Sequence, residues 1–340
     1  MTNVLEVEDL HVSFRAYGGE VQAVRGVSFS VRPGETLAIV GESGCGKSVT
    51  ARAIMGMVKA PRGRVKKGSV RLHGRELSCL GKKEWQQIRG AQIGMIFQDP
   101  MTSLNPTMKL GTQIAEVLVK HQKLSAKKAR EKAIELLAAV GIPEPERRCD
   151  QYPHECSGGM RQRIVIAIAL ACDPQVIIAD EPTTALDVTI QAQILALLQD
   201  LQQAKGTSII MITHDLGVVA EVADQMAVMY AGVIVEQGPV AEVFDNPQHP
   251  YTRGLLQSVP RLDQPSEERL IPIQGAPPDL FAPPAGCPFA ARCDYAMEVC
   301  AEHMPQSTAF SLQHQAKCWL HDSRARRVEE LVSAGRERHV

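Results

Sequence analysis

This 340-residue chain carries the stretch Gly41-Glu42-Ser43-Gly44-Cys45-Gly46-Lys47-Ser48, which decides its fold class. The spacing G-x-x-x-x-G-K-S is typical of a loop whose backbone N–H groups hold nucleotide phosphates, because small residues let the backbone approach closely. An apolar run over residues 35–40 predicts a buried strand before the loop, and residues 49–55 predict a helix after it. Lys47 is expected to reach the β- and γ-phosphates, and Ser48 is expected to bind Mg²⁺. The sequence therefore predicts an α/β protein that binds a nucleoside triphosphate.

Composition and charge favour a globular protein, and the length suggests about two domains. Hydrophobic residues make up 44% of the chain, and the formal net charge of -1 provides no general basic field for nucleic acid. The longest apolar run, residues 164–172, is much shorter than the roughly 18 residues that a membrane span needs. The first residues have no signal-peptide character. We therefore expect a cytosolic chain that reaches a membrane only through a partner.

Polar residues follow several of the predicted strands at the carboxyl end, where ligands bind in α/β sheets. These residues are Gln98, Asp180 with Glu181, and His214. A carboxylate such as Asp180 suits Mg²⁺, and the neighbouring Glu181 could polarise a water molecule. A lone histidine is more often structural than functional, but the position of His214 favours function. The sequence thus predicts that the catalytic residues lie at the carboxyl ends of the strands.

Two further segments carry candidate nucleotide contacts. From about residue 110 to 172 the apolar pattern is helical, which predicts a helical lobe inserted into the α/β core. Near its end, Ser157-Gly158-Gly159 opens a helix and predicts a second anion-binding terminus; the alternative is an ordinary serine N-cap. Tyr17 lies in a glycine-containing loop between predicted strands, where its ring could stack on a nucleobase. The alternative for Tyr17 is a surface tyrosine.

Cys45 is the unusual residue within the phosphate loop. It lies beside Lys47 and just before a predicted helix, and both neighbours lower the pKa of a thiol. We expect a cysteine that alkylating reagents modify quickly and that bound ATP protects. The alternative is a buried, inert thiol.

The last part of the chain has a composition of its own. Prolines concentrate in residues 260–286, which predicts a linker or an extended arm. Four cysteines follow, at Cys287, Cys293, Cys300 and Cys318. In a cytosolic protein such a cluster indicates a metal centre more often than disulfides, and a metal would supply folding energy to a short segment. Zn²⁺ usually takes closely spaced cysteine pairs, whereas a [4Fe–4S] cluster takes four thiolates at wider spacing. Free or disulfide-linked thiols are the third alternative.

The order of these motifs resembles the ATP-binding subunits of ABC transporters. The ordered set is the phosphate loop, Gln98, Ser157-Gly158-Gly159, Asp180-Glu181, Asp187 and His214. Residues 97–106, 180–193 and 249–252 are more closely similar to the ATPase subunits of bacterial oligopeptide and dipeptide importers, which also resemble nickel-importer subunits.

The resemblance implies a P-loop NTPase core with an antiparallel β-subdomain and an inserted helical lobe at about residues 99–172. This nucleotide-binding domain would cover residues 1–257. Residues 258–340 would form a proline-rich arm and a small C-terminal extension with the cysteine cluster.

The resemblance also implies roles for individual residues. Tyr17 would stack on adenine, and the loop from Gly41 to Ser48 would hold the phosphates. Gln98 would sense Mg²⁺ and the attacking water, Glu181 would be the general base, and His214 would contact the γ-phosphate.

The remaining implied roles concern a second subunit and a cluster. Ser157, Gly158 and Gly159 would cap the γ-phosphate of a nucleotide held by the opposite subunit, and Asp187 would cross the dimer interface. In the family that the chain resembles, the C-terminal extension holds a [4Fe–4S] cluster. The resemblance therefore favours [4Fe–4S] over zinc for the four cysteines. The loop over residues 98–106 would contact the membrane subunit.

The function that follows from the resemblance is ATP-driven import of di- or oligopeptides by a complex on the cytoplasmic face of the cell membrane. The implied partners are a second ATPase subunit of the same or a similar chain, two multi-span permease subunits and an extracytoplasmic peptide-binding protein. Nickel or another small solute is the alternative cargo. A soluble ABC ATPase acting on DNA or ribosomes is a competing class, but the chain has one ATPase half and no basic excess. A metabolite kinase leaves the Ser157-Gly158-Gly159 motif and His214 unexplained.

Overall fold

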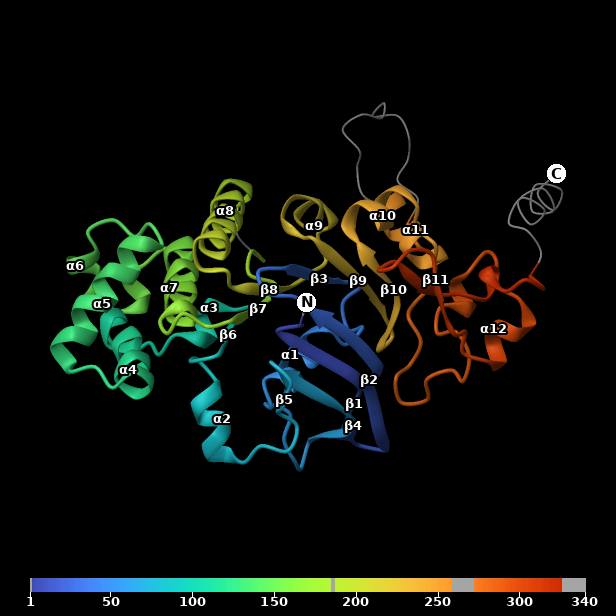
Figure 1. The fold of residues 1–340 in the computed structure, drawn as a ribbon, viewed down its shortest axis with the longest axis horizontal. Helices are drawn as coiled ribbons and strands as arrows, with labels where there is room; N and C mark the ends of the chain where they lie inside the picture. Colours follow the sequence, from blue (N-terminus) through green and yellow to red (C-terminus); the bar gives the residue numbers. More distant parts are fainter. Residues whose placement is uncertain (1, 185–186, 259–271, 326–340) are drawn as a thin grey trace.

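The computed structural model describes residues 2–184, 187–258 and 272–325 of the chain (Figure 1). Its centre is a sheet in the order β11-β12-β10-β9-β3-β8-β7-β6. The parallel strands of this sheet are β3 (Thr36–Val40), β6 (Ile93–Ile96), β7 (Val176–Asp180), β8 (Ser208–Thr213) and β9 (Gln225–Tyr230). Nearly all their residues are buried, as expected for parallel strands that are covered on both faces. The predicted α/β class with a P-loop NTPase core is confirmed.

A second, antiparallel sheet packs beside the first and has the order β2-β1-β4-β5. Its strands are β1 (Leu5–Ala16), β2 (Gly19–Val31), β4 (Gly63–Leu72) and β5 (Arg75–Glu76). In β2, buried Val27, Phe29 and Val31 alternate with exposed residues, so one face joins the core and the other meets solvent. The helix α2 (Lys82–Ile88) follows this sheet.

The helical lobe lies at the β6 end of the central sheet, on the left in Figure 1. It consists of α3 (Pro100–Ser103), α4 (Leu110–Gln122), α5 (Ala126–Ala139), α6 (Pro145–Cys149), the 3₁₀ turn η1 (Pro153–Glu155) and α7 (Gly158–Leu170). Ser125 caps α5 as expected, because its hydroxyl accepts a hydrogen bond from the backbone N–H of Lys128. The lobe shares its apolar core with β6, β7 and β8, so it is fixed to the sheet by buried side chains.

The C-terminal extension lies at the opposite end of the central sheet (Figure 1). Its elements are η2 (Ala290–Arg292), α12 (Glu298–Glu302), β11 (Ser307–Ala309), β12 (Gln315–Lys317) and η3 (Trp319–His321). β12 pairs antiparallel with β10 (Val233–Pro239), which itself pairs antiparallel with β9. The extension therefore continues the same sheet that carries the phosphate loop.

The expected proline-rich arm is only partly within the described residues. Residues 259–271, and the charged C-terminal segment from residue 326 onward, lie outside them. The described part runs beside β2, where the backbone N–H of Gln22 donates to the carbonyl of Leu280 at 2.9 Å. Arg25, also in β2, donates to the carbonyl of Pro284 at 2.9 Å.

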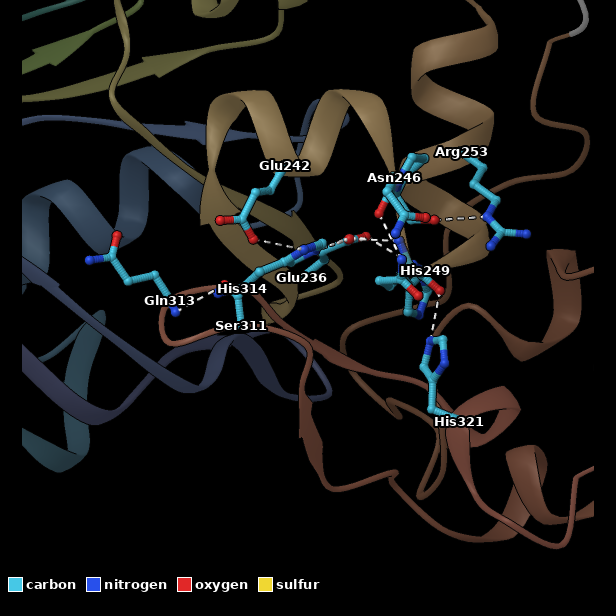
Figure 2. Close-up of polar contacts among 11 residues, drawn as sticks. Glu236, Glu242, Asn246, His249, Arg253, Ser311, Gln313, His314 and His321 are labelled. Carbon is cyan, nitrogen blue, oxygen red and sulfur yellow. Dashed lines mark hydrogen bonds and ion pairs between the residues drawn. The ribbon is translucent and has the colours of Figure 1, made fainter.

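A buried polar cluster fastens the extension to the core (Figure 2). The carboxylate of Glu236, on β10, is fully buried and accepts hydrogen bonds from the backbone N–H groups of Gln248 and His249 at 2.7 and 2.9 Å. Its third partner is His314 of the extension, whose Nε2 lies 2.8 Å from Oε1 of Glu236. Figure 2 shows the His314 ring between Glu236 and Glu242, with Glu242 3.7 Å from the other ring nitrogen. A buried carboxylate needs such partners, so this cluster fixes the extension in one position.

The remaining helices flank the central sheet. They are α1 (Lys47–Ile54), α8 (Val188–Lys205), α9 (Leu216–Val222), α10 (Val240–Asp245) and α11 (Pro250–Gln257). None of the helices in the described ranges is long and apolar enough to cross a membrane.

Candidate nucleotide site

The phosphate loop connects β3 to α1, and its backbone requires glycine at two positions. Gly41 has a φ of 148°, and a Cβ there would lie 2.1 Å from the carbonyl oxygen of Met229. Gly46 has a φ of 107°, and a Cβ there would lie 2.3 Å from the carbonyl oxygen of Ala23. A side chain at either position would displace backbone, so these two residues fix the path of the loop.

Lys47 is held over the loop. Its ammonium group donates to the carbonyl of Gly41 at 2.6 Å and to the carbonyl of Glu42 at 2.9 Å. Lys47 is only 5% exposed, so its ammonium group is enclosed by the loop. At the N-terminus of α1, this charge and the helix dipole both favour a bound anion.

Ser48 and Asp180 meet across the sheet edge although 132 positions separate them in the chain. The hydroxyl of Ser48 donates to Oδ1 of Asp180 at 2.8 Å. Burial raises the pKa of Asp180, whereas this hydrogen bond and the charge of Arg52 partly offset the increase. A hydroxyl and a carboxylate are the oxygen ligands that Mg²⁺ prefers, so the donor types fit this ion.

Glu181 is the centre of a polar group at the end of β7. Its backbone is left-handed, with a φ of 49°, a conformation that costs a non-glycine residue energy and often marks a functional site. Oε2 accepts hydrogen bonds from Gln98 at 2.8 Å and from the hydroxyl of Thr184 at 2.9 Å. Nδ1 of His214 lies 3.4 Å from Oε1. The structure thus brings Gln98, Glu181 and His214 together, and adds Thr184.

The sequence motifs do not point to Thr184. The sequence does place it three positions after Glu181, within reach of a turn at the end of a strand. The end of a predicted strand indicates which residues lie at the edge of the sheet. Whether a side chain in the following turn reaches the site depends on the geometry of that turn, which the sequence does not give.

The motif Ser157-Gly158-Gly159 lies in the helical lobe, apart from the phosphate loop between β3 and α1 (Figure 1). Ser157 caps α7 by accepting a hydrogen bond from the backbone N–H of Met160, and Gly158 and Gly159 form the first turn. From the same helix, buried Gln162 donates to the carbonyl of Pro182 at 2.6 Å. The motif is therefore tied to the chain just after Glu181, although it does not join the phosphate loop.

Two other predicted contacts are exposed on the surface. Tyr17 is fully exposed in the turn between β1 and β2. Asp187 caps α8, because Oδ1 accepts a hydrogen bond from the backbone N–H of Ile190 at 2.9 Å. Capping alone accounts for an aspartate at that position, whereas nothing in the fold accounts for the exposed ring of Tyr17.

Cys45 differs from the expectation. The residue is only 5% exposed, and burial raises the pKa of its thiol despite the nearby charge of Lys47. The expectation of a lowered pKa was wrong, because the cost of burying a thiolate exceeds the attraction of one ammonium group. The buried, inert thiol is the alternative that the structure supports.

Cys287, Cys293 and Cys300 lie in or against one apolar cluster, and Cys318 lies near them; all four are free thiols rather than disulfides. Burial raises the pKa of Cys293 and of Cys318 to about 12, and the neighbouring thiolates contribute to both shifts. The backbone N–H of Cys287 donates to the carbonyl of Cys300 at 2.7 Å. Within the described ranges, however, no group of three or more His, Cys, Asp or Glu side chains is arranged to hold a metal ion.

Comparisons with known proteins agree with this geometry. The ABC transporter family model matches residues 24–184, and the model of the oligopeptide/dipeptide transporter C-terminal region matches residues 235–300. The chain is 60% identical to the oligopeptide transport ATP-binding protein OppD of Bacillus subtilis, over 98% of this chain and 94% of the relative. It is 58% identical to the dipeptide transport ATP-binding protein DppD of the same organism, over 98% of this chain and 99% of the relative.

The core of the chain is also similar to a solved structure. The dimeric post-hydrolysis state of the ATP-binding cassette MJ0796, bound to ADP and phosphate, superposes with a TM-score of 0.63. The sequences are 27% identical, and the match covers 69% of this chain and 98% of that chain.

Proposed function

Because the chain belongs to the family of ATP-binding subunits of oligopeptide and dipeptide ABC transporters, we propose that it powers peptide uptake by ATP hydrolysis. It is the ATPase motor subunit of a peptide importer, and it uses ATP with Mg²⁺. The observation that supports this most strongly is similarity over nearly the whole chain to both kinds of peptide-transport subunit, including the C-terminal region.

In the proposed mechanism the phosphate loop and Lys47 hold the β- and γ-phosphates, and Tyr17 stacks on adenine. Ser48 and Asp180 would hold Mg²⁺, which neutralises phosphate charge, and Gln98 would lie next to them. The distance of 2.8 Å between Ser48 and Asp180 supports this pairing.

Glu181 is the proposed general base, which takes a proton from the attacking water. Its carboxylate is oriented by Gln98 and Thr184, so one oxygen is occupied and the other faces His214. His214 would contact the γ-phosphate and keep the reacting group near Oε1. Positioned general bases contribute roughly 10²–10⁴-fold to a rate, which is the scale expected for Glu181.

The site needs a second ATPase subunit in this proposal. Ser157, Gly158 and Gly159 would close the nucleotide site of the opposite subunit, and Asp187 would lie at the interface. Two observations support a site shared between two subunits. The motif lies apart from the phosphate loop of its own chain, and the similar ATP-binding cassette MJ0796 is a dimer. The partner is the same or a similar chain.

The other proposed partners are two multi-span permease subunits and an extracytoplasmic peptide-binding protein, with this subunit on the cytoplasmic face of the membrane. Residues 98–106 would contact the permease. The segment is exposed at Met101, and its short helix α3 is capped by Asp99, which gives the surface a fixed shape.

For the extension we propose a structural [4Fe–4S] cluster held by Cys287, Cys293, Cys300 and Cys318. The four thiols have the number and donor type that such a cluster takes, but in the described residues they are not arranged as a ligand set. The support is therefore the donor chemistry, and no catalytic step depends on the cluster.

Uptake in a strain that lacks this gene tests the proposed function. Labelled dipeptides, longer peptides and Ni²⁺ are supplied separately, and the gene is restored as wild type or as Glu181→Gln. We expect loss of peptide uptake, rescue by the wild type and no rescue by Glu181→Gln. Loss of Ni²⁺ uptake alone would assign the alternative cargo, and unchanged uptake of all three would contradict a transport role.

A further inference from the structure

We propose that Arg292 of the C-terminal extension positions the phosphate loop for ATP by holding the side chain of Glu42. The inference deepens the proposed ATPase function and rests on it. It gives the extension a part in nucleotide binding, and it identifies Glu42 as the residue through which the extension acts.

The contact between Arg292 and Glu42 is close and well shielded from solvent. Nη1 of Arg292 lies 2.8 Å from Oε2 of Glu42, and the two side chains are 6% and 27% exposed. A guanidinium is always charged, and a shielded charge-assisted hydrogen bond is stronger than one between neutral groups. The pair therefore restrains the second residue of the phosphate loop.

Arg292 itself is held in place by the extension and the core. Its Nε donates to the carbonyl of Gln274 at 2.8 Å, and Nη2 donates to the carbonyl of Ile273 at 3.1 Å. Nη1 also donates to the hydroxyl of Tyr230 at 3.1 Å. These hydrogen bonds fix the orientation of the guanidinium, with Nη1 directed at the carboxylate of Glu42.

Glu42 is restrained at its backbone as well as at its carboxylate. Its N–H donates to the hydroxyl of Tyr251 at 2.9 Å, and its carbonyl accepts from Lys47. Burial raises the pKa of Tyr251, so this hydroxyl stays protonated and can donate one hydrogen bond while it accepts the one from Glu42. Lys47 also donates to the carbonyl of Gly41, so the peptide groups on both sides of Glu42 are held by hydrogen bonds.

Aromatic packing makes this arrangement rigid. The ring of Tyr230 lies 4.6 Å from that of Tyr251 and 5.3 Å from that of Phe289, which belongs to the extension. His249 caps α11 by accepting a hydrogen bond from the backbone N–H of Tyr251. Burial lowers the pKa of His249 to about 3, so the ring is neutral and can accept. Arg292 is therefore connected to Lys47 through Glu42, and each of these three groups is held in place by further contacts.

This path leads to ATP binding rather than to the chemical step. Lys47 contacts the loop that Glu42 belongs to, whereas Glu181, Gln98 and His214 lie at the ends of other strands and touch neither Arg292 nor Glu42 in the described contacts. Loss of the contact should loosen the loop before ATP binds. The penalty should then appear in the KM for ATP and in ATP affinity, with little change in kcat.

The test compares Arg292→Gln, Glu42→Gln and the double variant in the assembled transporter. We expect each single variant to raise the KM for ATP and the Kd about tenfold, the scale of one charge-assisted contact, with kcat within about twofold. The double variant should be no worse than either single variant, because both remove the same interaction. Arg292→Lys should restore part of the affinity.

His314→Gln is the matched control. It removes another buried contact between the extension and the core, at Glu236, but it touches no residue of the phosphate loop. We expect a lower unfolding temperature and an unchanged KM.

Several outcomes would overturn the inference. These are a wild-type KM in Arg292→Gln, multiplicative effects in the double variant, or an equal rise in KM in His314→Gln. If Arg292→Gln does not fold, Arg292→Lys takes its place, and a wild-type KM in that variant contradicts the inference. Absence of ATP hydrolysis by the wild type would instead contradict the proposed function.

Discussion

The side-chain amide of Gln98 donates a hydrogen bond to Oε2 of Glu181 at a distance of 2.8 Å. The two residues follow β6 and β7, which are neighbouring parallel strands, so their carboxyl ends bring the side chains together. This contact orients the carboxylate of Glu181 and leaves Oε1 on the side of His214.

The first prediction is that Glu181→Gln binds ATP normally but hydrolyses it at least about 10²-fold more slowly. The amide keeps the size of the side chain but cannot take a proton from water. ATP affinity and single-turnover hydrolysis in the assembled transporter measure the two effects separately, and ATP should accumulate in a stable dimer. Hydrolysis at the wild-type rate would remove Glu181 from its proposed role.

The second prediction concerns Cys45. Because burial raises the pKa of its thiol, the thiolate fraction at pH 7 is lower than that of a free cysteine. Alkylation followed by mass spectrometry should therefore be slower at Cys45 than at exposed Cys79, and it should continue to accelerate above the pH at which free thiols level off. Cys45→Ser should remain active. Labelling of Cys45 as fast as that of Cys79 would contradict the burial argument.

The third prediction concerns Tyr17, whose ring is fully exposed and makes no contribution to the core. Tyr17→Ala should leave the unfolding temperature unchanged and weaken ATP binding, because stacking on the base is lost. Inorganic triphosphate has no base, so its affinity should not change, and Tyr17→Phe should bind ATP like the wild type. Equal losses for ATP and triphosphate would mean that Tyr17 acts on the loop and not on the base.

The fourth prediction concerns the proposed permease contact. Met101 is 59% exposed in the segment that follows Gln98, and Val119 on α4 is 42% exposed elsewhere in the helical lobe. Met101→Ser should reduce peptide uptake while basal ATPase activity is retained, and Val119→Ser is the control in which both stay normal. Parallel loss of uptake and ATPase activity in Met101→Ser would argue against a coupling role.

The fifth prediction concerns the four late cysteines. Anaerobically purified protein should be brown, should absorb broadly near about 400 nm and should contain roughly four irons per chain. Replacing Cys300 with serine should lower the iron content and loosen the extension, while the loop at residues 41–48 still binds ATP. Colourless anaerobic protein with one zinc per chain would establish the alternative metal.

The sequence was sufficient for the fold class and for the groups around Glu181. The phosphate loop has a characteristic spacing, and parallel strands place their carboxyl ends at one edge of the sheet, so the sequence alone predicts that Gln98, Asp180 and His214 lie at that edge. Their distances required the structure, as did the contact with Thr184.

Other features depend on tertiary placement, for which the sequence holds no local signal. Arg292 and Glu42 are 250 positions apart, and neither lies in a pattern that indicates the other. The expectation for Cys45 is wrong because a neighbouring lysine can be read from the sequence, whereas burial of the thiol cannot. The sequence does not predict the pairing of β12 with β10, because a three-residue strand has little periodicity.

The pairing of β12 with β10 has a practical consequence for a shortened form of this protein. A chain cut after residue 257 would keep every motif of the nucleotide site, yet the backbone groups of Glu236 and Gln237 that face β12 would be open to other chains. Uncovered strands of this kind recruit further strands and promote aggregation. The carboxylate of Glu236 would also lose His314, its only side-chain hydrogen-bond partner among the described residues. The shortened chain should therefore self-associate, because the extension no longer covers this edge of the sheet.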